Sequence, residues 1–207
     1  MTRLGTVPPL ALQLPAPDTI RARCIALAML DAILIPSPLA ERPHEYRTRW
    51  MRGASLARWH DGLGNHRHIA FSPAGVIAVA HSADAPTPTR PGPVDQAPYS
   101  LQALITASVR IPADEHTFCA WRTSGATAWS TAGEADSADV RYLFESVLDT
   151  GTYRTDTENY LDRTLSPQAI EAVLSLRPLT GDTISALNPT VEIASVLADM
   201  DTIGYPR

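Results

Sequence analysis

Residues 67–82, RHIAFSPAGVIAVAHS, consist of two short apolar runs separated by SPAG at 72–75. Proline followed by alanine and glycine is typical of a tight turn, since proline fixes φ and glycine accepts a positive φ. Each apolar run has the length of a strand. We therefore expect an antiparallel hairpin over this stretch.

A glycine-containing loop precedes this hairpin. Residues 61–65, DGLGN, follow residues 46–60, in which arginine and tryptophan partly alternate, as in half-exposed strands. Gly62 and Gly64 supply the positive φ that such a loop needs. They lack the third glycine and the following helix of a dinucleotide-binding loop. The three runs together predict a three-stranded antiparallel meander.

A second hairpin and an N-terminal helix are expected around this meander. Residues 117–124, TFCAWRTS, and 127–131, TAWST, predict two more strands joined around Gly125. Asp18 is expected to cap a helix that ends at Pro36. The apolar face of that helix consists of Ile20, Cys24, Leu27, Leu30 and Leu34.

The C-terminal third has helical periodicity. One helix is expected to begin at Asp139 and to close at Gly151, with apolar residues at helical spacing. These residues are Val140, Leu143, Phe144, Val147 and Leu148. Further helices are expected over 157–163 and at the Ser-Pro and Asn-Pro pairs at 166–167 and 188–189. Ser166 is expected to be the N-cap of its helix, with Pro167 at the first helical position.

The order of helix, strands and helices predicts an α+β fold, with an antiparallel sheet packed against N-terminal and C-terminal helices. The 207 residues, of which 44% are apolar and 19% charged, are enough for a single domain. We expect a proline-rich arm over 1–17, a proline-rich connecting loop over 83–98, and an acidic, mainly helical part over 137–207.

The charged residues exclude several kinds of chemistry. All 17 basic residues are arginine, so P-loop, Schiff-base, Ser–Lys and protein-kinase mechanisms are excluded. No Gly-x-Ser-x-Gly nucleophile motif occurs either, and the sequence favours a protein that is not an enzyme.

The net charge of -5 is distributed unevenly, with about +3 over residues 1–130 and about -8 over residues 131–207. An acidic C-terminal part argues against nucleic acid and suits a basic partner.

The cysteines and the apolar stretches indicate the compartment. Cys24 and Cys119 are expected to be buried free thiols, because nothing in their spacing demands a disulfide.

The proline-rich N-terminus does not resemble a signal peptide. The longest apolar stretch, residues 24–35, contains Asp31 and is too short to span a bilayer. We therefore expect a cytoplasmic protein without membrane contact.

Three histidines form a candidate metal site. If Phe71 pairs with Val76 across the turn, and if the loop at 61–65 is tight, three imidazoles meet at one end of the meander. These are His60, His66 and His81. They could hold zinc, with Asp61 or Asp84 as fourth ligand, in a metal-dependent hydrolase. The alternative is a set of surface or hydrogen-bonded histidines and no cofactor, because a one-residue slip in register moves the side chains apart.

Two candidate binding surfaces follow from the aromatic and acidic residues. The four tryptophans on or near predicted strands are Trp50, Trp59, Trp121 and Trp129, with Arg52 and Arg58 among the arginines beside them. Tryptophan and arginine anchor protein interfaces. Arginine stacked on tryptophan also suits single-stranded nucleic acid, but the excess of positive charge is too small for that partner. A further alternative is that the tryptophans belong to the core of the sheet and the arginines are solvated. The second surface is acidic and helical, with Asp156, Glu158 and Asp162; their charge reversal should slow association with a basic partner.

Short motifs along the chain resemble a family of small bacterial proteins. In order they are Trp50, Ala57-Arg58, Gly62-Leu63-Gly64-Asn65, Phe71, Gly75, Thr117-x-Cys119-x-Trp121, Trp129, Pro178-Leu179, Leu187-Asn188-Pro189 and Ile203-Gly204-Tyr205-Pro206. The resemblance covers roughly residues 18–207. That family carries an Asp-His-Glu-Ser-like stretch after the third strand, which reads AHSAD at 80–84 here, so acidic residues of that stretch are missing.

Small acidic α+β proteins of this kind are often immunity proteins, which bind and block a toxin made by the same cell. The resemblance therefore implies a non-catalytic immunity or antitoxin-type protein whose partner is a cognate toxin. A metal-dependent hydrolase and a regulatory subunit of a larger assembly are the alternatives, and the oligomeric state stays open.

Overall fold

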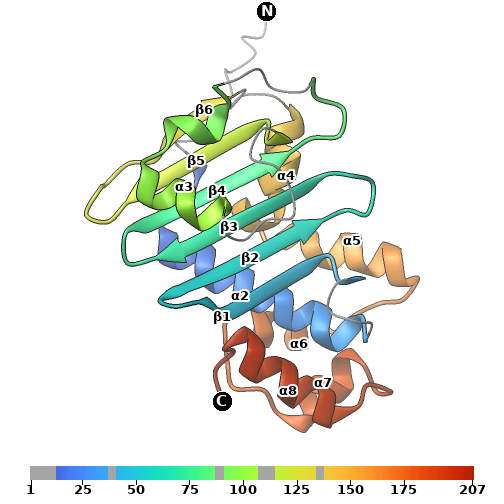
Figure 1. The fold of residues 1–207 in the computed structure, drawn as a ribbon. Coiled ribbons are helices and arrows are strands. Elements are labelled where there is room, and N and C mark those ends of the chain that lie inside the picture. Colours follow the sequence, from blue (N-terminus) through green and yellow to red (C-terminus); the bar gives the residue numbers. More distant parts are fainter. Residues whose placement is uncertain (1–12, 37–40, 87–90, 107–114, 134–137) are drawn as a thin grey trace, which may run out of the picture.

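The structure is a computed structural model that describes residues 13–36, 41–86, 91–106, 115–133 and 138–207. It confirms the α+β class, because helices pack against an antiparallel sheet whose six strands lie side by side in chain order (Figure 1). The strands are β1 (His44–Met51), β2 (Ala54–His60), β3 (His66–Ser72), β4 (Gly75–His81), β5 (Phe118–Thr123) and β6 (Ser130–Gly133).

The β3–β4 hairpin has the register that the turn chemistry predicted. Phe71 pairs with Val76, and His66 pairs with His81. Gly75 has a φ of +136°, and a Cβ atom at this position would lie 2.3 Å from the carbonyl oxygen of Arg122 on β5. The close approach of β4 and β5 therefore requires glycine here.

Residues 46–60, which were expected to supply one strand of the meander, belong to two strands. β1 and β2 pair antiparallel around a turn that contains Gly53, whose φ is +74°. A lone glycine between two arginine- and tryptophan-rich runs is a weak turn signal, and the hairpin was missed for this reason. The predicted second hairpin, β5–β6, pairs with β4, so all strands form one sheet.

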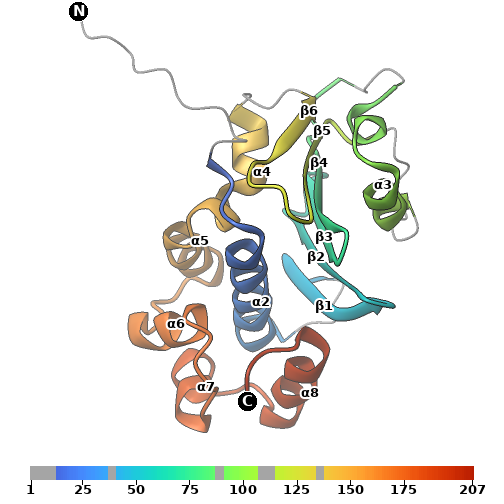
Figure 2. The same cartoon turned by 90° about the vertical axis from the view of Figure 1, so that its left-hand side faces the viewer.

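Helices cover both faces of the sheet (Figure 2). α2 (Pro17–Leu34) lies against one face, and α3 (Tyr99–Thr106) and the short helix η2 (Pro93–Gln96) lie against the other. α2 begins at Pro17, and Asp18 lies in its first turn without capping it, so the predicted Asp18 cap was wrong. From Ala26 onward α2 is buried all round, because the sheet covers one side and the C-terminal helices cover the other.

The C-terminal helices are α4 (Ala138–Leu148), α5 (Gly151–Leu161), α6 (Pro167–Leu174), α7 (Gly181–Leu187) and α8 (Ile193–Ile203). Ser166 caps α6 as predicted, since its Oγ accepts a hydrogen bond from the amide of Ala169 at 3.3 Å. Gly151 opens α5 instead of closing α4, which corrects the expected boundary. The sequence did not predict α7, which ends at Asn188. The side-chain amide of Asn188 donates a hydrogen bond to the carbonyl oxygen of Ile33 on α2, at 2.8 Å.

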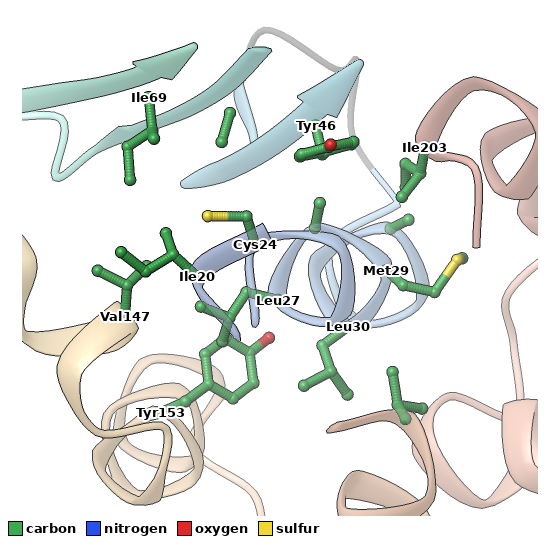
Figure 3. Close-up of a cluster of buried hydrophobic side chains, with 14 of the residues drawn as sticks. Ile20, Cys24, Leu27, Met29, Leu30, Tyr46, Ile69, Val147, Tyr153 and Ile203 are labelled. Carbon is green, nitrogen blue, oxygen red and sulfur yellow. The ribbon is translucent and has the colours of Figure 1, made fainter. Parts of the chain in front are cut away.

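Two hydrophobic cores hold the layers together. The main core joins the sheet to α2 and the C-terminal helices (Figure 3). The smaller core lies between the sheet and α3. Cys24 belongs to the first and Cys119 to the second, and burial raises the pKa of Cys24 to about 11 and that of Cys119 to about 12. The prediction of buried free thiols is confirmed.

Some predicted segments lie outside the described residues. They are residues 1–12 of the proline-rich arm, 87–90 of the connecting loop and residue 137 at the start of the acidic part. Among the helices that the structure describes, none combines the length and the apolar character needed to cross a membrane.

Candidate functional site

A cavity of about 440 Å³ opens where the C-terminal end of α2 meets β1, β2, α4 and α5. We call it the acidic pocket. The described residues that line it are Asp31, Ile35, Pro43, His44, Trp59, His60, Asp61, Tyr142, Glu145, Ser146, Thr152, Tyr153, Asp156, Thr157 and Tyr160. They include four carboxylates and four aromatic side chains of Tyr or Trp, and no arginine is among them.

A hydrogen-bond network around Asp31 forms the floor of the acidic pocket. Asp31 is 1% exposed, and its Oδ2 accepts from the backbone amide of His44 at 2.7 Å and lies 3.0 Å from the Nδ1 of that residue. Its Oδ1 accepts from the hydroxyl of Tyr153 at 2.7 Å. The ring of Tyr153 reaches from α5 toward α2, as Figure 3 shows. Burial and the Asp31 carboxylate raise the pKa of Tyr153 well above its usual value, so the phenol stays protonated and donates.

Ser146, His44 and Asp31 have the connectivity of a Ser-His-Asp triad, because the Nε2 of His44 lies 3.2 Å from Ser146 Oγ. Acyl transfer also needs donors aimed at the developing oxyanion. Ser146 lies within α4, whose backbone amides are used by the helix, and Arg67 Nη2 approaches its Oγ at 3.3 Å from the core. The arrangement therefore resembles a buried structural network that connects α2, β1, α4 and α5 more closely than an acylating site.

The mouth of the acidic pocket is aromatic and negatively charged. Tyr142 and Tyr160 are 49% and 74% exposed there, and the rings of Trp59 and Tyr142 meet edge to face at 5.7 Å. Partial burial raises the pKa of Tyr142, and the carboxylates of Asp61, Asp156 and Glu145 raise it further. These three negative charges therefore converge on a single phenol at the opening.

Arg67 supports the pocket from below. It is buried, its guanidinium donates to the carbonyl oxygen of Leu143, and it lies 5.5 Å from the centre of the Trp59 ring. Burial lowers the pKa of Arg67 to about 10, which still leaves it charged at neutral pH. The cation holds Trp59 and α4 in place beneath the pocket and does not occupy its opening.

The structure separates the residues predicted to bind a partner. Trp59 and Asp156 line the acidic pocket. Trp50 packs against the smaller core on the opposite face of the sheet, and Arg52 is exposed in the β1–β2 turn. The remaining three are Arg58, Glu158 and Asp162.

Each of those three has its own structural setting. Arg58 lies 3.8 Å from Glu45 Oε1 on the α3 side of the sheet. Glu158 accepts a hydrogen bond from the amide of Leu165 at 2.9 Å, which fixes the loop between α5 and α6. Asp162 ends α5 with a left-handed backbone, at a φ of 48°. Of the three acidic residues predicted from the helical surface, Asp156 is the one that lines the pocket.

The second candidate site is a cluster of histidines. It lies at the end of the sheet where β2, β3 and β4 meet the start of β5. His60 pairs with His66 and His66 with His81 in the backbone register, as expected. The rings of His66 and His81 stack with centroids 4.9 Å apart. Ring nitrogens that lie within 4.8 Å of one another belong to His66, His68 and His116, so this group shares only His66 with the predicted ligands.

The sequence contained a signal for part of this group. His66 and His68 are two residues apart on one strand, so they point to the same face of the sheet. His116 lies just before β5 and reaches this face through strand pairing that begins about 35 residues after β4 ends. Spacing alone could have indicated the first two histidines but not the third.

Comparison of the chain with models of known protein families, with curated proteins and with solved structures gave no match. The structure is that of an α+β protein with an acidic, aromatic pocket and a histidine cluster on the opposite face of the sheet. The resemblance to a family of small bacterial proteins stays a prediction.

Proposed function

We propose that this protein acts by binding another protein, and that the partner places a basic side chain in the acidic pocket. The partner that we propose is a toxin, so that the chain serves as an immunity or antitoxin-type protein. The observation that carries the proposal is the convergence of Asp61, Glu145 and Asp156 on the exposed aromatic mouth of the pocket.

The chemistry of the pocket favours a cationic group. An arginine guanidinium or a lysine ammonium is attracted to carboxylates and to the faces of tyrosine and tryptophan rings. Tyr142 and Tyr160 supply exposed rings, and Asp156 and Glu145 supply exposed carboxylates beside them. Tyrosine, tryptophan and arginine are the residues in which binding energy concentrates at protein interfaces. A basic side chain of the partner would thus meet both charge and aromatic surface in one place.

The toxin assignment is supported by the same features taken together with the acidic C-terminal third. A negatively charged surface accelerates association with a basic protein and makes the rate sensitive to salt. An inhibitor that only has to occlude its target needs such a surface and needs no reaction of its own. The Asp31 network supplies the rigidity, because it fixes the four elements that form the pocket floor.

Capture of the tagged protein's partners from its own host, at low and at high salt, tests this proposal. The pocket variant is Glu145→Gln/Asp156→Asn, because both carboxylates are exposed and line the pocket. The matched control is Asp182→Asn/Glu192→Gln, which makes the same charge change at exposed positions outside the pocket. We expect one stoichiometric partner with a toxin-like domain for wild type and control, and its loss for the pocket variant.

Three results would contradict parts of the proposal. Equal capture by the pocket variant and the control removes the pocket from the interface. Absence of a stoichiometric partner at either salt removes the binding function itself. A partner that is not toxic to the host when expressed alone contradicts the immunity role and leaves the pocket as a binding site.

A further inference from the structure

Three imidazoles meet on the α3 side of the sheet, away from the acidic pocket. His66 and His68 come from β3, and His116 comes from the residues that lead into β5. Figure 1 shows β3, β4 and β5 side by side. The ring centroids are 5.4 Å apart for His66 and His68, 6.2 Å for His66 and His116, and 6.4 Å for His68 and His116. One nitrogen of each ring lies within 4.8 Å of the other two.

His66 is already arranged as a ligand. Its Nδ1 lies 3.2 Å from the carbonyl oxygen of Gly64, to which it can only donate, so the proton is on Nδ1 and the lone pair is on Nε2. That Nε2 is buried and has no hydrogen-bond partner in the described chain. Metal-binding histidines commonly donate their other nitrogen to a backbone carbonyl in this way.

His68 is the most deeply buried of the candidate ligands on β3, with 3% of its surface exposed. Its Nδ1 makes no hydrogen bond to any described residue. Burial lowers the pKa of His68 to about 2, with further lowering by Arg58 and by the neighbouring histidines, so the ring is neutral at physiological pH. A buried, neutral imidazole with an unsatisfied nitrogen is costly unless something binds it.

Arg58 determines which nitrogen of His68 is available. Its Nε–H donates to His68 Nε2 at 3.3 Å, which places the proton of the neutral ring on Nδ1. Coordination through Nδ1 requires the other tautomer, and Arg58 must then withdraw from Nε2. Glu45 offers an alternative partner, because Arg58 Nη1 lies 3.8 Å from Glu45 Oε1, and Glu45 Oε2 is buried without a hydrogen bond, 3.7 Å from Arg47 Nη2. Movement of Arg58 toward Glu45 would convert the 3.8 Å ion pair into a hydrogen bond and release His68.

A cavity gives access to this group. It has a volume of about 290 Å³ and is bordered by His66 and His68, by Arg58, Trp59 and His60, and by the glycine loop between β2 and β3. The space is sufficient for a water molecule at a fourth coordination position. Gly64, which borders the cavity, has a φ of +105° that disfavours a side chain there.

We propose that His66, His68 and His116 bind a zinc ion, with water from the adjoining cavity as fourth ligand. Neutral nitrogen ligands suit Zn²⁺ and disfavour Mg²⁺ and Ca²⁺, which prefer oxygen. Tetrahedral Zn–N bonds of about 2.0–2.1 Å place the ligand nitrogens about 3.3 Å apart. Because these nitrogens lie within 4.8 Å of one another without the metal, the rings must approach one another by up to about 1.5 Å when zinc binds. The three ligands lie on the opposite face of the sheet from the acidic pocket, and the two cavities share Trp59 and His60 at this end of the sheet.

Zinc titration of the chelator-treated, full-length protein tests this site, with a chromophoric chelator as competitor and thermal unfolding as second readout. We expect one Zn²⁺ per chain and a rise in melting temperature on addition of the metal. His66→Ala, at a half-buried position, and His68→Phe, which retains the ring volume, should each weaken binding by about 100-fold or more. Co²⁺ bound in place of Zn²⁺ should show visible absorption bands in wild type that both variants lose.

The control is His81→Phe, because His81 stacks on His66 but is outside the ligand group. It should retain the affinity of wild type. A wild-type protein that binds no stoichiometric zinc would overturn the proposal, and so would a loss of affinity in His81→Phe as large as that in His66→Ala. If His68→Phe does not fold, the comparison of His66→Ala with His81→Phe decides the question alone.

Discussion

The hydroxyl of Tyr153 on α5 donates a 2.7 Å hydrogen bond to Oδ1 of Asp31 on α2, across 122 residues of chain. The other oxygen of Asp31 accepts from the backbone of His44 and lies against its ring. One buried carboxylate thus holds α2, α5 and the first strand in a fixed relation. The acidic pocket is built on this connection.

Tyr153→Phe removes the hydroxyl and leaves Asp31 Oδ1 buried without that donor. We expect a loss of about 1–3 kcal/mol in the free energy of unfolding, because an unsatisfied buried acceptor loses its solvation without replacement. The melting temperature should fall by about 2–4 °C for each kcal/mol in a chain of this size. Tyr160→Phe, at a position that is 74% exposed, is the control and should change stability by less than about 0.5 kcal/mol. Equal melting of the two variants would refute the structural role of the Asp31 network.

Gly75→Ala should destabilise the sheet more than Gly53→Ala. Both positions have positive φ, so both variants carry the backbone cost of about 1–2 kcal/mol. Only at Gly75 would the new Cβ meet backbone, 2.3 Å from the carbonyl oxygen of Arg122, whereas nothing lies within 4 Å at Gly53. Overpacking should add about 1–3 kcal/mol at Gly75. Urea unfolding of both variants checks this, and a larger loss for Gly53→Ala would contradict the β4–β5 packing.

The stability of the metal-free protein should depend on pH through His68. Its folded pKa of about 2 lies below the ordinary value of 6.5, so the unfolded chain takes up the proton more readily. The contribution of neutral His68 to the free energy of unfolding is therefore fully present above pH 6.5, and it is lost as the pH falls toward the folded pKa. Between these two pKa values, the free energy of unfolding should fall by up to about 1.4 kcal/mol for each pH unit. His68→Phe should show a flatter dependence between neutral and mildly acidic pH in urea unfolding, and a dependence as steep as that of wild type would disprove the assignment.

Arg58→Gln should tighten zinc binding. Arg58 donates to His68 Nε2 and places a positive charge beside the ligand group, so its removal takes away both a competing hydrogen bond and a repulsion. We expect the affinity to rise about 3- to 10-fold in the chelator competition. Arg52→Gln is the control, since it removes the same charge from the exposed β1–β2 turn. Weaker binding in Arg58→Gln than in Arg52→Gln would exclude the proposed movement of Arg58.

Local chemistry explains which parts of the fold could be predicted. The SPAG turn fixed the β3–β4 register, and with it the pairing of His66 and His81, because its proline and glycine act within four residues. The Ser166 cap was predictable for the same reason. The β1–β2 turn and α7 were missed, since a single glycine and a threonine cap are weak signals by themselves.

The sites depend on contacts that are distant in sequence. Asp31 meets His44 across 13 residues, His44 meets Ser146 across 102, and no periodicity predicts such contacts. The predicted ligands His60, His66 and His81 rested on a correct register, but only His66 belongs to the group whose ring nitrogens come together. The register alone does not show that His116 joins His66 and His68 on that face. The acidic helical surface was a general feature of the sequence, and only the packing of α5 against α2 brings Asp156 to a pocket.

The dissociation constant of the captured partner, measured with purified components at low salt, shows whether the acidic pocket receives that partner. We predict that Glu145→Gln/Asp156→Asn weakens binding at least about 10-fold while Asp182→Asn/Glu192→Gln stays within about twofold of wild type. Equal dissociation constants for the two double variants would contradict the claim that the acidic pocket receives the partner.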